Sequence, residues 1–193
     1  AIVFHDDDLD RLTEAKGPVK ALSTQALQMV KLNGTPNRMQ TLAEMLEQVA
    51  GRVTLVIELK SLWDGDDALV KQALRVLESY DGPHCLMSFD PDVVACLRAL
   101  SPQTVRGIVA DRATDPYYNA LPLAKRLAIR SFAHLGETQP HFVSFYWRDL
   151  PFAPVTEIRN AGHPVITWTL RSKAEASEAL RYCDQITFEG YTP

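Results

Sequence analysis

Two oppositely charged residues stand at the end of one apolar segment of this 193-residue chain. In residues 53–60 every odd-numbered side chain is apolar. The last two even-numbered side chains of this segment are the charged Glu58 and Lys60. A strand sends alternate side chains to opposite faces, so one face is apolar and the other becomes ionic at its carboxyl end. There Glu58 could hold a divalent cation through oxygen, and Lys60 could meet an anion. The alternative is an edge strand whose two charges are simply solvated.

His5 is the candidate for general acid or base catalysis, because it alone among the histidines follows a strand-like segment and adjoins carboxylates. The alternative is an ordinary histidine of a surface turn. The aspartates at positions 6, 7, 8 and 10 could bind a metal, but a solvated loop in which one of the last two pairs with Arg11 is more typical. The remaining four histidines lie at strand starts or in loops, and we expect them to be structural.

Further polar and aromatic side chains end other strand-like segments. Ser88 and Asp90 end one such segment, Trp168 ends another, and Thr187 and Glu189 end the last. In a parallel α/β barrel the carboxyl ends of the strands meet at one rim, so we expect these residues to converge with Glu58 and Lys60. Trp168 could line a substrate pocket there, and the alternative is a tryptophan of the core.

Strand-like and helical periodicities alternate along the chain, which predicts an α/β fold with a parallel sheet. No glycine-rich turn follows the first strands, and this favours a barrel over an open doubly wound sheet. We expect strands at residues 1–4, 53–60, 84–89, 105–110, 141–147, 164–170 and 185–188. We expect helices at residues 24–30, between the Thr41 cap and Gly51, and at residues 66–80, 90–100, 122–128, 155–160 and 172–182.

No linker or shift in composition divides the chain, so we expect one domain over residues 1–193. Seven strands in one domain predict a (β/α)8 TIM barrel. Because such barrels usually take about 250 residues, we expect this one to lack its first strands. The chain also opens directly on a strand-like segment at Ala1, without an initiator Met. We therefore expect the natural protein to carry residues before Ala1.

Composition narrows the partners. A formal charge of −4 argues against nucleic acid or an anionic membrane surface as the main partner, although a small anionic substrate needs only a local basic group. No apolar segment is long enough for stable membrane insertion. The three scattered cysteines have no CxxC spacing, which favours reduced thiols and a cytoplasmic location. The sequence does not indicate an oligomeric state.

Several segments, in order and over nearly the whole chain, resemble the glycerophosphodiester phosphodiesterase family. Residues 5–13, HDDDLDRLT, resemble the HDxxLxRxT segment of that family, and residues 41–44, TLAE, resemble its TLxE helix start. Residues 56–60, VIELK, are similar to its IExK strand. Later signatures are matched by MSFDP at residues 87–91, PVITWTLR at residues 164–171 and ITFEG at residues 186–190.

This resemblance implies a TIM barrel of the phosphatidylinositol-phospholipase type. It implies hydrolysis of glycerophosphodiesters to an alcohol and glycerol 3-phosphate with a divalent cation, Mg2+ or Ca2+. It also implies that His5 is one of two catalytic histidines, that Glu58 is a metal ligand, and that Lys60 contacts phosphate. One imidazole would deprotonate the attacking hydroxyl of the substrate and the other would protonate the leaving alcohol. Water would then open a cyclic phosphate.

The chain departs from the family pattern at its start. The HRG strand, with the first histidine, and the ExD strand, with two metal carboxylates, would both precede Ala1. We therefore expect the 193-residue chain alone to have negligible phosphodiesterase activity. Two more strands would also bring the count to nine, so one predicted strand must lie outside the barrel, and we expect it at residues 141–147 or 185–188.

Two other functions stay open at this point. The first is a catalytically inactive barrel that binds a phosphorylated ligand or a partner protein. The second is a related phospholipase that acts on lysolipids or sphingolipids. The presence or substitution of the HRG and ExD segments would separate the enzyme from the binding protein.

Overall fold

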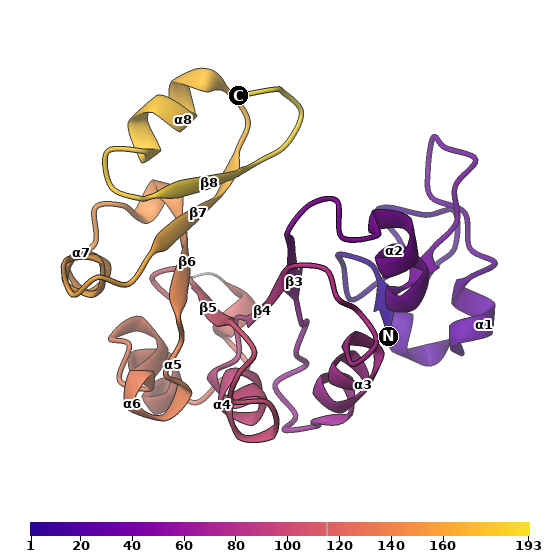
Figure 1. Ribbon diagram of the computed structural model, residues 1–193, viewed down its shortest axis with the longest axis horizontal. Coiled ribbons are helices and arrows are strands. Elements are labelled where there is room, and N and C mark those ends of the chain that lie inside the picture. The colour runs from indigo at the N-terminus through magenta and orange to yellow at the C-terminus, as the bar shows by residue number, and fades with distance from the viewer. Residues whose placement is uncertain (115) are drawn as a thin grey trace. The chain divides into compact units, whose positions relative to one another are not determined.

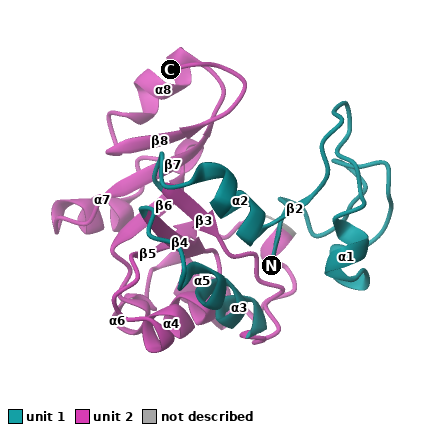
Figure 2. Ribbon diagram, turned by 45° about the vertical axis from the view of Figure 1, so that its right-hand side comes forward, with its two compact units in different colours: residues 1–54, 68–83 teal, residues 55–67, 84–193 magenta. Residues whose placement is uncertain are grey.

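The computed structural model describes residues 1–114 and 116–193 of the chain. These residues form two compact units, one of residues 1–54 and 68–83 and one of residues 55–67 and 84–193 (Figure 2). The prediction of a single domain over residues 1–193 stays a prediction. Within the described ranges, no helix has both the length and the apolar character needed to cross a membrane.

The second unit is built on a parallel sheet whose strands are neighbours in the order in which they occur in the chain (Figure 1). Consecutive parallel strands joined by helices are the arrangement of a (β/α)8 barrel. The described residues supply six such strands, and the fold is thus an incomplete barrel. The strands are β3 (Leu55–Glu58), β4 (His84–Ser88), β5 (Arg106–Ala110), β6 (Phe142–Tyr146), β7 (Val165–Leu170) and β8 (Gln185–Phe188).

Two helices of this unit begin at a residue whose side chain caps the helix. Asp90 accepts a hydrogen bond from the backbone of Asp92 at the start of α4, and Ser172 accepts one from Glu175 at the start of α8. Short 3-10 segments lie at Pro116–Tyr118 and Trp147–Asp149. The helices are α4 (Pro91–Leu100), α5 (Leu123–Arg130), α6 (Leu135–Thr138), α7 (Ala153–Asn160) and α8 (Lys173–Ala179).

One face of the sheet forms the main core with these helices. Ile108, Val143 and Val165 come from neighbouring strands, and all are almost completely buried. They belong to one apolar cluster with Val94 of α4 and Ala179 of α8. Since alternate residues of a strand point to opposite faces, the helix-covered face leaves the other set of side chains for a site.

The first unit has a small sheet and a core of its own. Strand β1 (Ile2–Val3) pairs antiparallel with β2 (Gln40–Thr41). The predicted Thr41 cap is confirmed, and it forms a capping box in which Thr41 and Glu44 exchange side-chain and backbone hydrogen bonds at the start of α2. The remaining elements are a 3-10 turn at Val19–Ala21, α1 (Thr24–Leu27), α2 (Leu42–Val49) and α3 (Ala68–Leu77).

One predicted strand lies outside the parallel sheet, as expected, but it is the one at residues 1–4. Only Ile2 and Val3 form a strand there, and they pair with residues 40–41. The expectation that the strand outside the barrel lies at residues 141–147 or 185–188 is wrong, since both segments are strands of the parallel sheet. The four residues before the acidic turn can form a short antiparallel strand as well as a strand of a parallel sheet. A segment this short has too little periodicity to distinguish the two.

Candidate functional site

Glu58 and Trp168 lie on the same face of the parallel sheet. Followed from β3 to β7, the strand register puts Glu58, Met87, Tyr146 and Trp168 on one face, opposite the helix-covered core. Each of these residues lies at or near the carboxyl end of its strand. Parallel barrels build their active sites at this end of the sheet.

Lys60 forms an ion pair with Glu58. Its Nζ lies 2.7 Å from Glu58 Oε1, and the side chains are 32% and 22% exposed. Lys60 stays on the face of Glu58 because strand pairing continues past β3, where the amide of Leu59 donates to the carbonyl of Met87 at 2.7 Å. Glu58 Oε1 is buried and, despite this ion pair, accepts no hydrogen bond of good geometry. The pair thus places an acidic oxygen and an ammonium group side by side.

Ser88 and Asp90, which were predicted at the rim, are both buried rather than open to a ligand. Ser88 Oγ donates to the carbonyl of Leu59 at 2.7 Å, and Asp90 Oδ2 accepts from Ser61 Oγ at 2.6 Å. Their partners flank Lys60 in the chain. These two residues therefore support the end of β3 and do not face a substrate.

Trp168 is half-buried and lies among aromatic rings. Its Nε1 donates to the carbonyl of Ser144 at 3.2 Å, and its ring centroid lies 5.1 Å from that of Tyr146. Its ring also packs against that of Phe89, which follows β4, with the two ring centroids 5.4 Å apart. Because β5 and β6 separate β4 from β7 in the sheet, this contact bridges the face that carries Glu58. Sequence reasoning missed Tyr146 and Phe89, although both stand at strand ends on the same alternation as Glu58 and Trp168.

His5 belongs to the first unit and is 71% exposed. Its Nδ1 lies 2.7 Å from Asp6 Oδ1, and the same carboxylate accepts two hydrogen bonds from the Arg11 guanidinium, at 2.6 and 2.7 Å. The bonds from Arg11, followed by that with His5, lower the pKa of Asp6 to about 2. An anionic Asp6 favours the proton on Nδ1, which leaves Nε2 of His5 directed to accept or deliver a proton.

The structure around His5 accounts for the other residues of the HDDDLDRLT motif. Leu9 and Thr13 are buried, and Thr13 Oγ1 donates to the carbonyl of Leu9 at 2.8 Å. Arg11 lies in the turn between them, and its exposed side chain pairs with Asp6. The predicted pairing of Arg11 with Asp8 or Asp10 stays a prediction. Arg11 pairs with Asp6 at 2.6 Å, and Asp10 Oδ1 lies 3.7 Å from Lys16 Nζ.

A divalent cation finds only part of a ligand set here. Glu58 has the right chemistry, since Mg2+ and Ca2+ prefer carboxylate oxygen, and its Oε1 accepts no hydrogen bond. Such ions take about six or more oxygen ligands. Among residues 1–114 and 116–193, no group of three or more His, Cys, Asp and Glu side chains is placed to hold a metal. The described donors thus fit one ligand of such a centre and not a complete site.

A cavity of about 470 Å³ lies in the first unit, away from all these residues in the sequence. It is formed by the carboxyl ends of α2 and α3 and the turns that follow them, with Leu46, Ala50, Val76 and Tyr80 in its lining. No predicted site residue contributes to it. It contains no histidine or basic side chain, and we assign it no role in phosphate chemistry.

Comparison with known proteins identifies the family. The sequence profile of the Glycerophosphoryl diester phosphodiesterase family matches residues 1–187. No curated protein matches the sequence of the chain.

Solved structures share the fold. An Oleispira antarctica phosphodiesterase in complex with the product sn-glycerol-3-phosphate superposes with a TM-score of 0.78 at 20% identity, over 97% of this chain and 74% of its own. A glycerophosphodiester phosphodiesterase from Parabacteroides distasonis gives 0.73 at 17% identity, over 97% and 73%. One from Thermotoga maritima gives 0.69 at 18% identity, over 97% and 74%. With its sequence profile and its fold in agreement, this chain belongs to the glycerophosphoryl diester phosphodiesterase family.

Proposed function

We propose that the Glu58–Lys60 end of the sheet binds the phosphate group of glycerophosphodiesters, and that the protein hydrolyses them to an alcohol and glycerol 3-phosphate. The observation that carries this proposal is the half-buried ion pair at the carboxyl end of β3, on the sheet face opposite the core. The product-bound structure of the Oleispira antarctica relative supports the same ligand chemistry for this fold.

Each candidate residue has a physical role in this proposal. The Lys60 ammonium would contact the phosphate, either in place of Glu58 or together with it. There it would neutralise the negative charge that develops on the phosphoryl oxygens. The half-exposed ring of Trp168 would provide an apolar wall for the carbon atoms of the substrate. His5 would transfer a proton through Nε2, with its tautomer set by Asp6.

The proposal includes a divalent cation, Mg2+ or Ca2+, with Glu58 as one ligand. The family membership of the chain supports this cation, and the Glu58 carboxylate supplies suitable oxygen. Since the described residues do not complete a ligand set, we expect the 193-residue chain by itself to have negligible activity.

A binding protein without catalysis is the second candidate function. The observation that favours it is the 2.7 Å contact between Lys60 Nζ and Glu58 Oε1. When Glu58 is paired with Lys60 its carboxylate need not hold a metal ion, and Lys60 can still bind an anion. Both candidates use Lys60 to bind the anion, and only the enzyme also needs His5 and Glu58.

An assay of released glycerol 3-phosphate tests the proposal. The natural polypeptide, with any residues it carries before Ala1, is incubated with a glycerophosphodiester and Mg2+ or Ca2+. We expect metal-dependent release that His5→Ala reduces by at least about a hundredfold, as for loss of a general acid or base. Glu58→Gln, which removes a proposed metal ligand, should also reduce the release. His163→Ala, which changes an exposed histidine elsewhere, is the matched control and should leave the rate unchanged.

The possible results separate the candidates. Binding of glycerol 3-phosphate without any turnover by the natural polypeptide would reject hydrolysis in favour of the binding protein. Turnover by the 193-residue chain, at a rate abolished by His5→Ala, would contradict the expectation that this chain alone is inactive.

We also infer a reducing compartment such as the cytoplasm. No disulfide joins Cys85, Cys96 and Cys183, all of which the structure describes. Burial raises the pKa of the Cys85 and Cys183 thiols, which keeps them protonated and slow to oxidise.

A further inference from the structure

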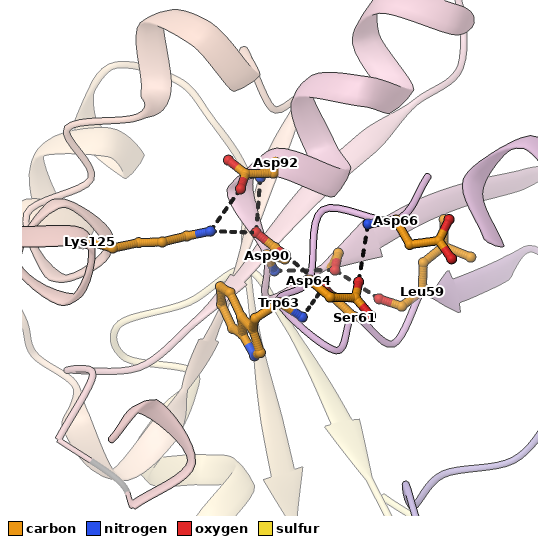
Figure 3. Close-up of polar contacts among 9 residues, drawn as sticks. Leu59, Ser61, Trp63, Asp64, Asp66, Asp90, Asp92 and Lys125 are labelled. Carbon is orange, nitrogen blue, oxygen red and sulfur yellow. Dashed lines mark hydrogen bonds and ion pairs between the residues drawn. The ribbon is translucent and has the colours of Figure 1, made fainter. Parts of the chain in front are cut away.

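The segment that carries Lys60 is tied to the junction of β4 and α4 on both sides of the lysine. Before it, the amide of Leu59 donates to Met87 at 2.7 Å, and the carbonyl of Leu59 accepts from Ser88 Oγ at 2.7 Å. After it, Ser61 Oγ donates to Asp90 Oδ2 at 2.6 Å (Figure 3).

Asp90 is the centre of these contacts. Its side chain is 2% exposed, so a charged carboxylate lies in a position that only good hydrogen bonds can stabilise. While Oδ2 accepts from Ser61, Oδ1 accepts from the amide of Asp92 at 3.0 Å and lies 3.5 Å from Lys125 Nζ. Figure 3 shows Asp90 between Lys125 on one side and Ser61 on the other.

Capping of α4 does not account for an aspartate here. One side-chain oxygen is enough for a cap, and Ser, Thr or Asn caps a helix about as well without burying a charge. The second oxygen of Asp90 reaches Ser61, which lies 29 residues earlier in the chain. Ser61 in turn accepts from the amide of Trp63 at 2.9 Å, so the same contact orders the chain beyond Lys60.

We propose that Asp90 is a positioning residue for Lys60, which it holds through Ser61. This inference rests on the phosphate-binding role proposed for Lys60. A lysine side chain on a mobile loop loses conformational entropy when it binds, whereas one on a fixed backbone loses less. The tethers at Leu59 and Ser61 fix the backbone on both sides of Lys60 while leaving its side chain to reach the ligand.

Removal of the Ser61 hydroxyl tests the proposal without touching the helix cap. Glycerol 3-phosphate is titrated into the natural polypeptide and its binding followed by NMR. We expect Ser61→Ala to weaken binding about fivefold, which corresponds to one lost hydrogen bond. Asp90→Ser keeps a capping oxygen but is too short to reach Ser61, and it should weaken binding at least as much. Ser61→Thr keeps a hydroxyl at this position and should bind like the unchanged protein. Ser172→Ala, which removes a hydroxyl that caps α8, is the control and should have no effect on binding.

A double-mutant cycle separates positioning from general support of the fold. If Ser61 acts through Lys60, Ser61→Ala should weaken binding no further in a Lys60→Met background. Equal weakening in both backgrounds would overturn the proposal.

Amide hydrogen exchange at residues 59–63, measured without ligand, gives an independent readout. Ser61→Ala should speed this exchange by about fivefold, again the value of one hydrogen bond, whereas Ser172→Ala should not. Unchanged exchange would overturn the proposal whatever the binding data show. If Lys60→Met leaves binding unchanged while Ser61→Ala still speeds exchange, the phosphate role of Lys60 fails and the tethering by Asp90 stands.

Discussion

Lys60→Met is expected to weaken the binding of glycerol 3-phosphate by at least about tenfold, since a hydrogen bond to a charged group contributes about 1.5–3 kcal/mol. The methionine keeps most of the apolar stem and removes only the ammonium group. In the folded protein this group lies 2.7 Å from Glu58 Oε1, at the end of β3. Isothermal titration calorimetry with the natural polypeptide measures the change.

The matched control is Lys173→Met. Lys173 begins α8 and is exposed. Its replacement removes the same charge from the same unit without changing the end of β3. Binding by Lys173→Met should equal that of the unchanged protein. A loss of similar size in both variants would mean that net charge, and not the position of Lys60, controls the affinity.

Acid is expected to destabilise the fold through His134. This histidine is 9% exposed, and burial lowers its pKa from 6.5 to about 4. The folded state therefore keeps the ring neutral while the unfolded chain takes up a proton below about pH 6.5. Stability contributed by the neutral ring is complete above pH 6.5 and falls as the pH drops toward 4. The full shift corresponds to about 3 kcal/mol.

Chemical denaturation at pH 7 and pH 4 measures this effect. His134→Gln can keep a hydrogen bond to Thr138, the present partner of Nδ1 at 3.3 Å, but it does not titrate. The loss of unfolding free energy between pH 7 and pH 4 should therefore be about 3 kcal/mol smaller in this variant. His163→Gln, at an exposed position, should behave like the unchanged protein. Equal pH dependence in all three proteins would show that His134 is protonated without cost in the fold.

The parallel sheet could be predicted from the sequence because its signals are local. Alternation over residues 53–60 and the capping residues Thr41 and Asp90 act within a few positions, and the structure contains the corresponding strand and helices. The same local signals failed at residues 1–4. Their pairing with residues 40–41 joins segments nearly forty positions apart, and no periodicity within either segment encodes that choice.

The site could be predicted only in part for the same reason. Glu58 and Lys60 stand two residues apart on one strand, so their common face follows from the period of a strand. The contact of Phe89 with Trp168 depends on how the sheet curves between β4 and β7, and the bond from Ser61 to Asp90 joins two separate loops. Such long-range contacts are products of packing, which composition and spacing do not specify.

NMR mapping of glycerol 3-phosphate on the chain is the most direct test of the central claim. The account predicts that the largest chemical-shift changes occur at the amides of residues 58–61 and at the indole N–H of Trp168. Lys60→Met should reduce these changes. Shifts confined to the cavity between α2 and α3, around Ala50 and Tyr80, would contradict the account and place anion binding in the first unit.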